Sequence, residues 1–155
     1  PKKGRKHILH IIRTLLDFKP ESNRTDIKQA VETLTRMQKR RCTAFMLSDF
    51  YQQKPFTKEL QICNRKHDVV AIQVYDRRDT TLPDIGLMRV RDAETGHEQY
   101  LDTSSKKVRN AYSEQWKKRQ DRLHETFTHS GVDSVAISTN DDYVKYLMML
   151  FKKRK

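Results

Sequence analysis

Two apolar runs restrict the fold of this chain more than any other feature. Residues Cys42–Leu47 and Val69–Val74 are largely apolar without regular polar alternation, and an aspartate follows each of them, Asp49 and Asp76. A strand that is apolar on both faces must be covered on both faces, which indicates a parallel sheet enclosed by helices. Because such sheets bind ligands at the carboxyl ends of their strands, Asp49 is the leading candidate for a site residue.

The predicted sheet contains few strands. Parallel strands are expected near residues 42–49, 69–75 and 132–137, and an antiparallel hairpin near residues 85–101 is expected to extend the same sheet. With helices before, between and after the strands, the predicted architecture is a layered α/β fold. The length of 155 residues fits one domain that spans residues 1–155. Strand 42–47 lacks a predicted neighbour on one side, which would leave an apolar edge.

Helical spacing of apolar residues predicts the covering layers. A helix is expected from Arg5 to Phe18, and a second helix begins near Thr25, whose hydroxyl would cap it. A long helix should begin at Ser104 or Ser105 and end at Gly131. Its predicted buried stripe consists of Val108, Tyr112, Trp116, Leu123 and Phe127.

Composition excludes several classes of protein. The net charge of +12 suggests nucleic-acid binding, but eight basic residues lie within 2–6 and 152–155, and charged ends are usually solvated tails. The four glycines do not cluster, which excludes a glycine-rich phosphate-binding loop. Cys42 and Cys63 form no disulfide or zinc pattern and are expected to be small buried side chains in a reducing cytoplasm. No apolar run reaches the ~20 residues that span a bilayer.

Thr25 and Asp49 are the candidate metal ligands. A hydroxyl and a carboxylate brought together at the carboxyl edge of a sheet are hard oxygen ligands that suit Mg²⁺. The competing interpretation is that Thr25 caps its helix and Asp49 caps the turn after its strand. Asp76, Asp79 and Asp84 would add carboxylates near the same edge, or they are solvated loop residues.

Long strings of this sequence are typical of one family. They are PKKGRKHIL, RTDIKQAVE, RCTAFMLSDF, RKHDVVAIQVYDRRDTTLPDIGLMRVRDAETG, YLDTSS and the ending GVDSVAISTNDDYVKYLMMLFKKR. Together they resemble the DUF58 family of bacterial proteins, and in particular members encoded with MoxR-type AAA+ ATPases in the Bat (aerotolerance) operons of Bacteroidetes. The resemblance extends over nearly the whole chain.

The resemblance implies a von Willebrand factor A-like, Rossmann-like three-layer sandwich with a metal-ion-dependent adhesion site. In that site a D-x-S-x-S segment, a threonine and an aspartate hold the cation, and the last two would be Thr25 and Asp49 here. The D-x-S-x-S segment is absent from this chain. Family members are longer, so the chain would be the C-terminal portion of the domain. Mg²⁺ is accordingly expected in the full-length protein, and no tightly bound cation is expected here.

The function implied by the resemblance is that of a non-catalytic protein-interaction module. It would act with a MoxR-type AAA+ ATPase and client proteins in protein assembly or maturation and in stress tolerance, in the cytoplasm and near the membrane. The exposed strand 42–47 is expected to pair with a second copy or to be covered by the N-terminal helix. The alternative is a metal-dependent nuclease or nucleic-acid-binding domain that uses Asp49, Asp76, Asp79 and the basic termini. The position of the basic charge in tails favours the module, with no specific nucleic acid as partner.

Overall fold

The computed structural model describes residues 3–20, 25–52, 54–92 and 96–154. The elements are α1 (Arg5–Asp17), α2 (Ile27–Met37), β1 (Thr43–Ser48), α3 (Thr57–Lys66), β2 (Asp68–Tyr75), the 3₁₀ helix η1 (Arg77–Asp79), β3 (Leu87–Arg91), β4 (Glu98–Asp102), α4 (Lys106–Ser130), β5 (Asp133–Ser138) and α5 (Tyr143–Lys153). The predicted turns at 19–24 and 92–96 and the basic residues Lys2 and Lys155 lie wholly or partly outside the described residues. None of the described helices is long and apolar enough to cross a membrane.

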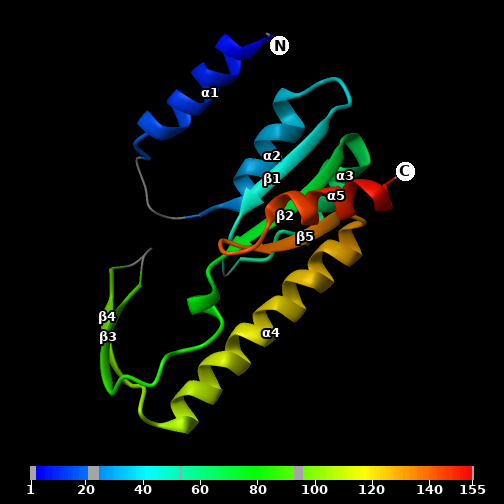
Figure 1. Ribbon diagram of the computed structural model, residues 1–155. Helices are drawn as coiled ribbons and strands as arrows, with labels where there is room; N and C mark the ends of the chain where they lie inside the picture. Colours follow the sequence, from blue (N-terminus) through cyan, green and yellow to red (C-terminus); the bar gives the residue numbers. More distant parts are fainter. Residues whose placement is uncertain (1–2, 21–24, 53, 93–95, 155) are drawn as a thin grey trace.

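The central sheet has the strand order β1-β2-β5, and both pairs are parallel (Figure 1). In the register, Thr43 lies opposite Asp68, and Val70 lies opposite Asp133. The prediction of three parallel strands is therefore confirmed, and helices lie on both faces of the sheet. The von Willebrand factor A-like fold in particular stays a prediction.

Strand β2 is the covered strand that its apolar sequence predicts. Val69 and Ala71 belong to a core with residues of α2, α3 and α4, whereas Val70 and Ile72 pack with Ile137 and with Leu150 of α5. Because successive side chains of a strand point to opposite faces, these two clusters lie on the two faces of the sheet. Three helices thus cover one face, and α5 covers the other.

Strand β1 differs from the prediction that both of its faces are covered. Its side chains alternate between exposed and half-buried, and Phe45 and Leu47 are 45% and 66% exposed. The reason is its position at the edge of the sheet, where α5 contacts the ring of Phe45 edge-on through Phe151 but leaves Phe45 and Leu47 largely exposed. The predicted apolar edge is confirmed, since β1 pairs with β2 alone within the described residues.

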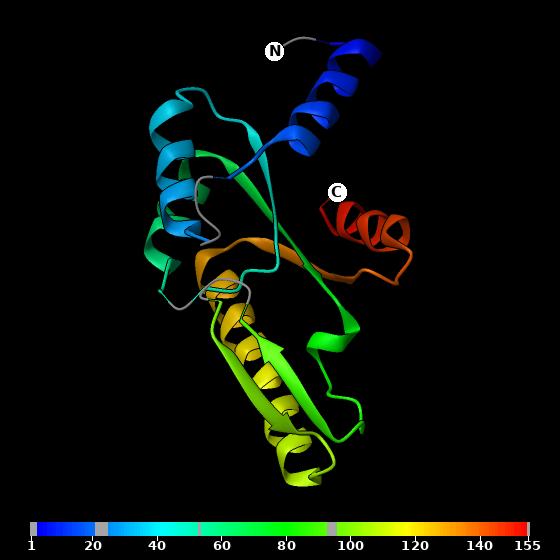
Figure 2. The ribbon, with the colours of Figure 1, turned by 90° about the vertical axis from the view of Figure 1, so that its left-hand side faces the viewer.

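Helix α1 does not cover that edge. It has the predicted apolar stripe, yet none of its residues is buried, and it lies away from the sheet in both views (Figures 1 and 2). The expectation that the N-terminal helix covers strand 42–47 is therefore wrong for this structure. Pairing of β1 with a second copy stays a prediction.

The antiparallel pair of β3 and β4 is present, but it forms a separate two-stranded sheet, so its predicted addition to the central sheet is wrong. Its base is held by Thr103, whose hydroxyl donates to the carbonyl of Gly86 at 2.6 Å and accepts from the N–H of Ile85 at 3.2 Å. Arg109 of α4 donates to the carbonyl of Thr103 at 2.6 Å. These bonds fasten the base of the hairpin to the start of α4, and Figures 1 and 2 show the hairpin and α4 joined at that end.

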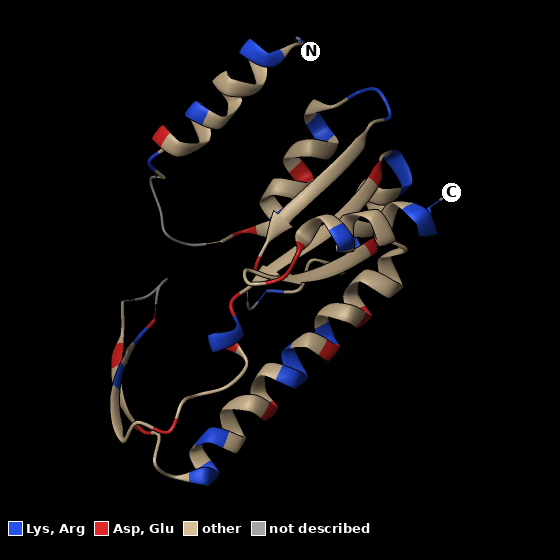
Figure 3. Ribbon diagram, viewed as in Figure 1, with Lys and Arg blue, Asp and Glu red and all other residues tan. Residues whose placement is uncertain are grey.

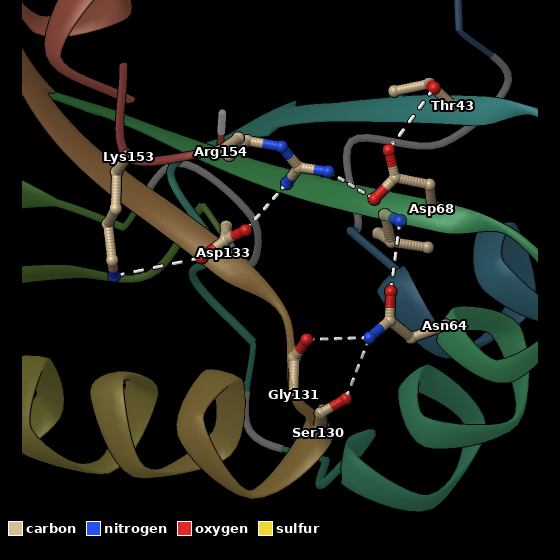
Figure 4. A network of polar contacts seen from close by, with 9 residues as sticks. Thr43, Asn64, Asp68, Ser130, Gly131, Asp133, Lys153 and Arg154 are labelled. Atoms are coloured by element: carbon tan, nitrogen blue, oxygen red, sulfur yellow. Dashed lines mark hydrogen bonds and ion pairs between the residues drawn. The ribbon is translucent and has the colours of Figure 1, made fainter. Parts of the chain in front are cut away.

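Asn64 joins three elements at the far end of α4 (Figure 4). Its side chain accepts from the N–H of Val69 at 3.0 Å and donates to the carbonyls of Ser130 and Gly131 at 3.2 and 2.7 Å. Gly131 adopts a left-handed conformation with φ of 63° and ends α4, as predicted. Asn64 therefore ties the connection between α4 and β5 to the start of β2.

The amino ends of the three parallel strands are closed by ion pairs (Figure 4). Arg154, at the end of α5, donates to the carboxylates of Asp68 at the start of β2 and of Asp133 at the start of β5. The hydroxyl of Thr43 donates to Asp68 at 3.3 Å, and Lys153 lies 3.8 Å from Asp133. This network, called the amino-edge clamp below, binds α5 to the sheet.

The two cysteines are free. Cys63 is fully buried in the core, which confirms the predicted packing role. Cys42 is half-buried, and its sulfur lies 3.5 Å from Nδ1 of the buried His67.

Candidate functional site

A cavity of about 790 Å³ lies at the carboxyl edge of the sheet. Its walls come from the segments that follow β1 and β2, from the β3–β4 hairpin, and from the side of α4 between Val108 and Arg119. We call it the carboxyl-edge cavity. Carboxyl edges of parallel sheets are where such folds usually bind ligands.

Thr25 and Asp49 both line the carboxyl-edge cavity, so the structure brings the two predicted residues to one site. Thr25 is not the N-cap of α2, however. Asp26 caps the helix, because its carboxylate accepts the N–H of Gln29 at 2.8 Å. The prediction of the cap was wrong by one residue, and the hydroxyl of Thr25 lies outside the helix that it was expected to cap.

Asp49 belongs to a tight turn after β1. Its Oδ1 accepts the N–H of Tyr51 at 3.0 Å and the hydroxyl of Ser48 at 3.3 Å. Between them Phe50 has a φ of 54°, a left-handed conformation that is rare for a residue other than glycine. The turn directs the Phe50 ring into the core, where it packs against Phe127 with 5.1 Å between ring centroids. Asp49 therefore has the turn-capping role that was its competing interpretation.

The other acidic candidates do not converge on Asp49. Asp76 and Asp79 form a capping box around η1, in which their carboxylates accept backbone N–H groups. Of these two residues only Asp79 lines the carboxyl-edge cavity. Asp84 instead forms an ion pair of 3.0 Å with Arg109 at the base of the hairpin. Among the residues that the structure describes, no group of three or more histidine, cysteine or acidic side chains could hold a metal ion.

The residues present do not by themselves fit Mg²⁺. The ion requires near-octahedral oxygen coordination and gives up its water reluctantly. Within the described ranges the cavity offers it the hydroxyl of Thr25 and the carboxylates of Asp49, Asp79 and Asp92. The carboxylates of Asp49 and Asp79 already accept backbone N–H groups, and no group of three or more acidic, histidine or cysteine side chains among the described residues could hold a metal ion. Further ligands would have to come from outside the described residues.

Aromatic rings were not expected in this site. Trp116 and Tyr112 were predicted as part of the buried stripe of α4, but both are only half-buried and line the cavity. Trp116 also contacts Tyr75 at the end of β2, with 5.5 Å between ring centroids. The helical spacing correctly placed these rings on one face of α4. That spacing does not distinguish a face that packs against the core from one that borders a cavity.

Arg119 fills the space between two of the rings. Its guanidinium carbon lies 4.4 Å from the centre of the Tyr51 ring and 5.5 Å from that of Trp116. Such cation–π contacts hold a guanidinium in a fixed orientation and leave its N–H groups available at the edge. Sequence analysis gave no signal for this cluster, because Tyr51 and Arg119 lie on different elements.

The electrostatics of the cavity keep one hydroxyl protonated. Burial raises the pKa of Tyr112, and the carboxylate of Asp79 raises it further, whereas Arg119 acts in the opposite direction. Tyr112 therefore remains a neutral hydrogen-bond donor at physiological pH. The cavity lining combines tyrosine hydroxyls and aromatic faces with arginine, His97 and the carboxylates of Asp49, Asp79 and Asp92.

Comparison with known proteins gives matches at the level of the family. The model of the family described as "Protein of unknown function DUF58" matches residues 1–122. Uncharacterized protein MAV169 of Mycobacterium avium is 29% identical over 136 residues, which are 88% of this chain and 80% of that protein. Uncharacterized proteins Rv1480 of Mycobacterium tuberculosis and Mb1516 of Mycobacterium bovis are each 36% identical over 95 residues, 60% of this chain but only 30% of each relative. No solved structure was found to match.

Proposed function

Since the chain belongs to the DUF58 family, we propose that it is a non-catalytic protein-interaction module whose partner binds in the carboxyl-edge cavity. The observation that supports this proposal is the composition of the cavity walls. Tyrosine, tryptophan and arginine are the residues that most often carry the binding energy of protein interfaces, and Tyr51, Trp116 and Arg119 meet in one cluster here. The cavity of about 790 Å³ is large enough for several side chains of a partner.

The proposed partner is a MoxR-type AAA+ ATPase, with which the module would act on client proteins during assembly, maturation and stress. This part of the proposal rests on the resemblance to family members of Bacteroidetes, whereas the relatives compared above are mycobacterial. We also retain as proposals a cytoplasmic location near the membrane and self-association through β1. Mg²⁺ would bind to Thr25 and Asp49 only in a longer protein that supplies further oxygen ligands.

The nuclease alternative has less support. Two-metal hydrolysis requires several carboxylates that converge on ions about 3.5–4 Å apart. Here the carboxylates of Asp76 and Asp79 accept backbone N–H groups of the η1 turn, while Asp49 caps the turn after β1. Lysine and arginine are spread over α1, the loop before β1, α4 and the end of α5 instead of forming one track (Figure 3).

The proposal is tested by calorimetric titration of the chain with a purified MoxR-type ATPase from the same genome. We expect Tyr51→Ala and Trp116→Ala each to weaken binding by about tenfold or more, as hot-spot residues do. Lys117→Ala is the matched control, because Lys117 lies on α4 next to Trp116, is exposed, and does not line the cavity. Unchanged binding by both cavity variants, with circular dichroism like that of the parent chain, would refute the cavity as the binding site. Absence of binding by the parent chain would refute the ATPase as the partner.

A further inference from the structure

A second hollow lies beside the carboxyl-edge cavity, and all of its charged lining residues are cationic. It measures about 600 Å³ and lies between α4 and residues 50–52 and 54–56, which lie between β1 and α3. Its cationic side chains are Lys54, Lys118, Arg119 and Arg122, and no aspartate or glutamate is among its lining residues. We call it the basic hollow. We infer that the basic hollow binds an acidic segment of a protein partner, with aspartate or glutamate side chains seated among these cations.

The cations of the basic hollow have no carboxylate partner in the described part of the chain. The ion pairs of α4 and its neighbours lie elsewhere, such as the pair of Arg109 with Asp84. Four like charges around one hollow repel one another, and a bound carboxylate relieves that repulsion. A guanidinium also offers parallel N–H donors that match a carboxylate in two hydrogen bonds.

The residues of α4 that line the hollow lie on one face of the helix. They are Gln115, Lys118, Arg119, Arg122, Leu123 and Thr126. Positions three and four apart lie on the same face of a helix, so these side chains form one row along α4. Residues 50–52 and 54–56 form the other wall of the hollow. Three of the lining side chains, Phe50, Phe56 and Leu123, are buried. The apolar part of the lining therefore belongs to the packed core.

Arg119 differs from the other three cations, because its guanidinium lies against the Tyr51 and Trp116 rings. A group that is held in its binding orientation loses less conformational entropy when a ligand arrives. Arg119 and Tyr51 also line the carboxyl-edge cavity, so they form the wall between the two hollows. Lys118 and Arg122 line the basic hollow and not the cavity.

The surroundings favour a protein segment over a nucleic acid. Glu114, Asp121 and Glu125 lie on α4 between and beyond these cations but do not line the hollow, and acidic positions interrupt the basic ones along the helix in Figure 3. A continuous phosphate backbone that crossed α4 would meet these carboxylates, whereas isolated acidic side chains can enter the hollow alone. The inference does not depend on what occupies the carboxyl-edge cavity.

The test uses fluorescein-labelled peptides of twelve residues and fluorescence anisotropy. One peptide alternates glutamate and leucine, and a second has glutamine in place of every glutamate. We expect the acidic peptide to bind about tenfold or more tightly than the glutamine peptide, and the double variant Lys118→Gln/Arg122→Gln to remove most of that difference. The control with the same net charge is Lys117→Gln/Lys145→Gln, since both of these residues are exposed and line neither hollow.

Three results would overturn the inference. The first is absence of binding by the acidic peptide, and the second is equal affinity for the two peptides. The third is an equal loss of affinity for the acidic peptide in Lys118→Gln/Arg122→Gln and in the control Lys117→Gln/Lys145→Gln. A fluorescein-labelled single-stranded oligonucleotide of twelve thymidines is the third probe. Tighter binding of that probe than of the acidic peptide, lost in the hollow variant, would assign the hollow to nucleic acid instead. Because Lys118 and Arg122 do not line the carboxyl-edge cavity, none of these results decides the function proposed for that cavity.

Discussion

Two arginines, Arg154 at the amino end of the central sheet and Arg119 at its carboxyl end, have opposite roles. At the amino end, Arg154 binds the carboxylates of both Asp68 and Asp133, and its side chain is only 19% exposed. At the carboxyl end, Arg119 is held by aromatic rings and has no ion pair within the described residues. Arg154 therefore stabilises the fold at one end, whereas Arg119 remains available for a ligand at the other. The difference separates charges that maintain the structure from charges that can act on a partner.

The largest expected effect comes from removal of the amino-edge clamp. Arg154→Ala leaves Asp68 and Asp133 close together without their shared cation. Their side chains are 39% and 37% exposed, so the loss falls between that of an exposed and a buried ion pair, about 1–3 kcal/mol of unfolding free energy. Urea denaturation followed by circular dichroism measures it.

Arg13→Ala is the control for this prediction. Arg13 pairs with Asp17 on α1, where both side chains are highly exposed, and the expected change is close to zero. Equal losses of stability in the two variants would contradict the special role assigned to the amino-edge clamp.

A smaller effect on stability is expected at the carboxyl end. Arg119→Ala removes two cation–π contacts at a half-buried site, which corresponds to about 0.5–1 kcal/mol. Trp116 is the single tryptophan of the chain, so its fluorescence reports directly on this contact. We expect a shift of the emission to longer wavelength in Arg119→Ala, because the ring becomes more hydrated. Arg154→Ala should leave the emission of the folded protein unchanged. A shift in Arg154→Ala without one in Arg119→Ala would contradict the roles assigned to the two arginines.

The smallest effect concerns an acidic residue that is paired at the carboxyl end. Burial disfavours ionisation of Asp141, but hydrogen bonds from Arg77, the Ser138 N–H and Tyr146 outweigh it, so the pKa of Asp141 is lowered from 3.8. The unfolded chain therefore takes up this proton first as the pH falls. The ionised carboxylate contributes stability above pH 3.8, and that contribution is lost as the pH falls through the lower pKa of the folded state.

The corresponding variant is Arg77→Gln, which removes an ion pair of 3.1 Å. We expect the pKa of Asp141 to rise and the variant to be slightly less stable than the parent chain at neutral pH. The two proteins should converge in stability below pH 3.8. Carboxyl chemical shifts followed by NMR against pH provide the measurement, and an unchanged titration of Asp141 would show that Arg77 does not influence it.

The parts of the fold that were predictable from the sequence depend on local pattern. The run Val69–Val74 predicted a strand with both faces covered, and Gly131 predicted the end of α4, because each signal lies within a few residues. The run Cys42–Leu47 is equally apolar but forms an edge strand with an exposed face. Which strand lies inside the sheet is decided by pairing and by the reach of α5, and neither is encoded in the strand itself.

The candidate site was predicted only in part for the same reason. Thr25 and Asp49 do line one cavity, as the rule for carboxyl edges of parallel sheets indicated. Arg119, by contrast, approaches Tyr51 only because α4 and the turn after β1 meet in three dimensions. The left-handed Phe50, on which that turn depends, also had no signal, since phenylalanine seldom adopts such a conformation.

Helix α1 has a consequence for how the protein behaves in different surroundings. It has thirteen residues, none of them buried, and helices of about 12–15 residues are barely stable alone in water. We therefore expect the helical content of α1 to rise when its apolar face contacts detergent, lipid or another polypeptide. The helical content of residues 5–17 is therefore expected to depend on the surroundings far more than that of the elements packed on the sheet.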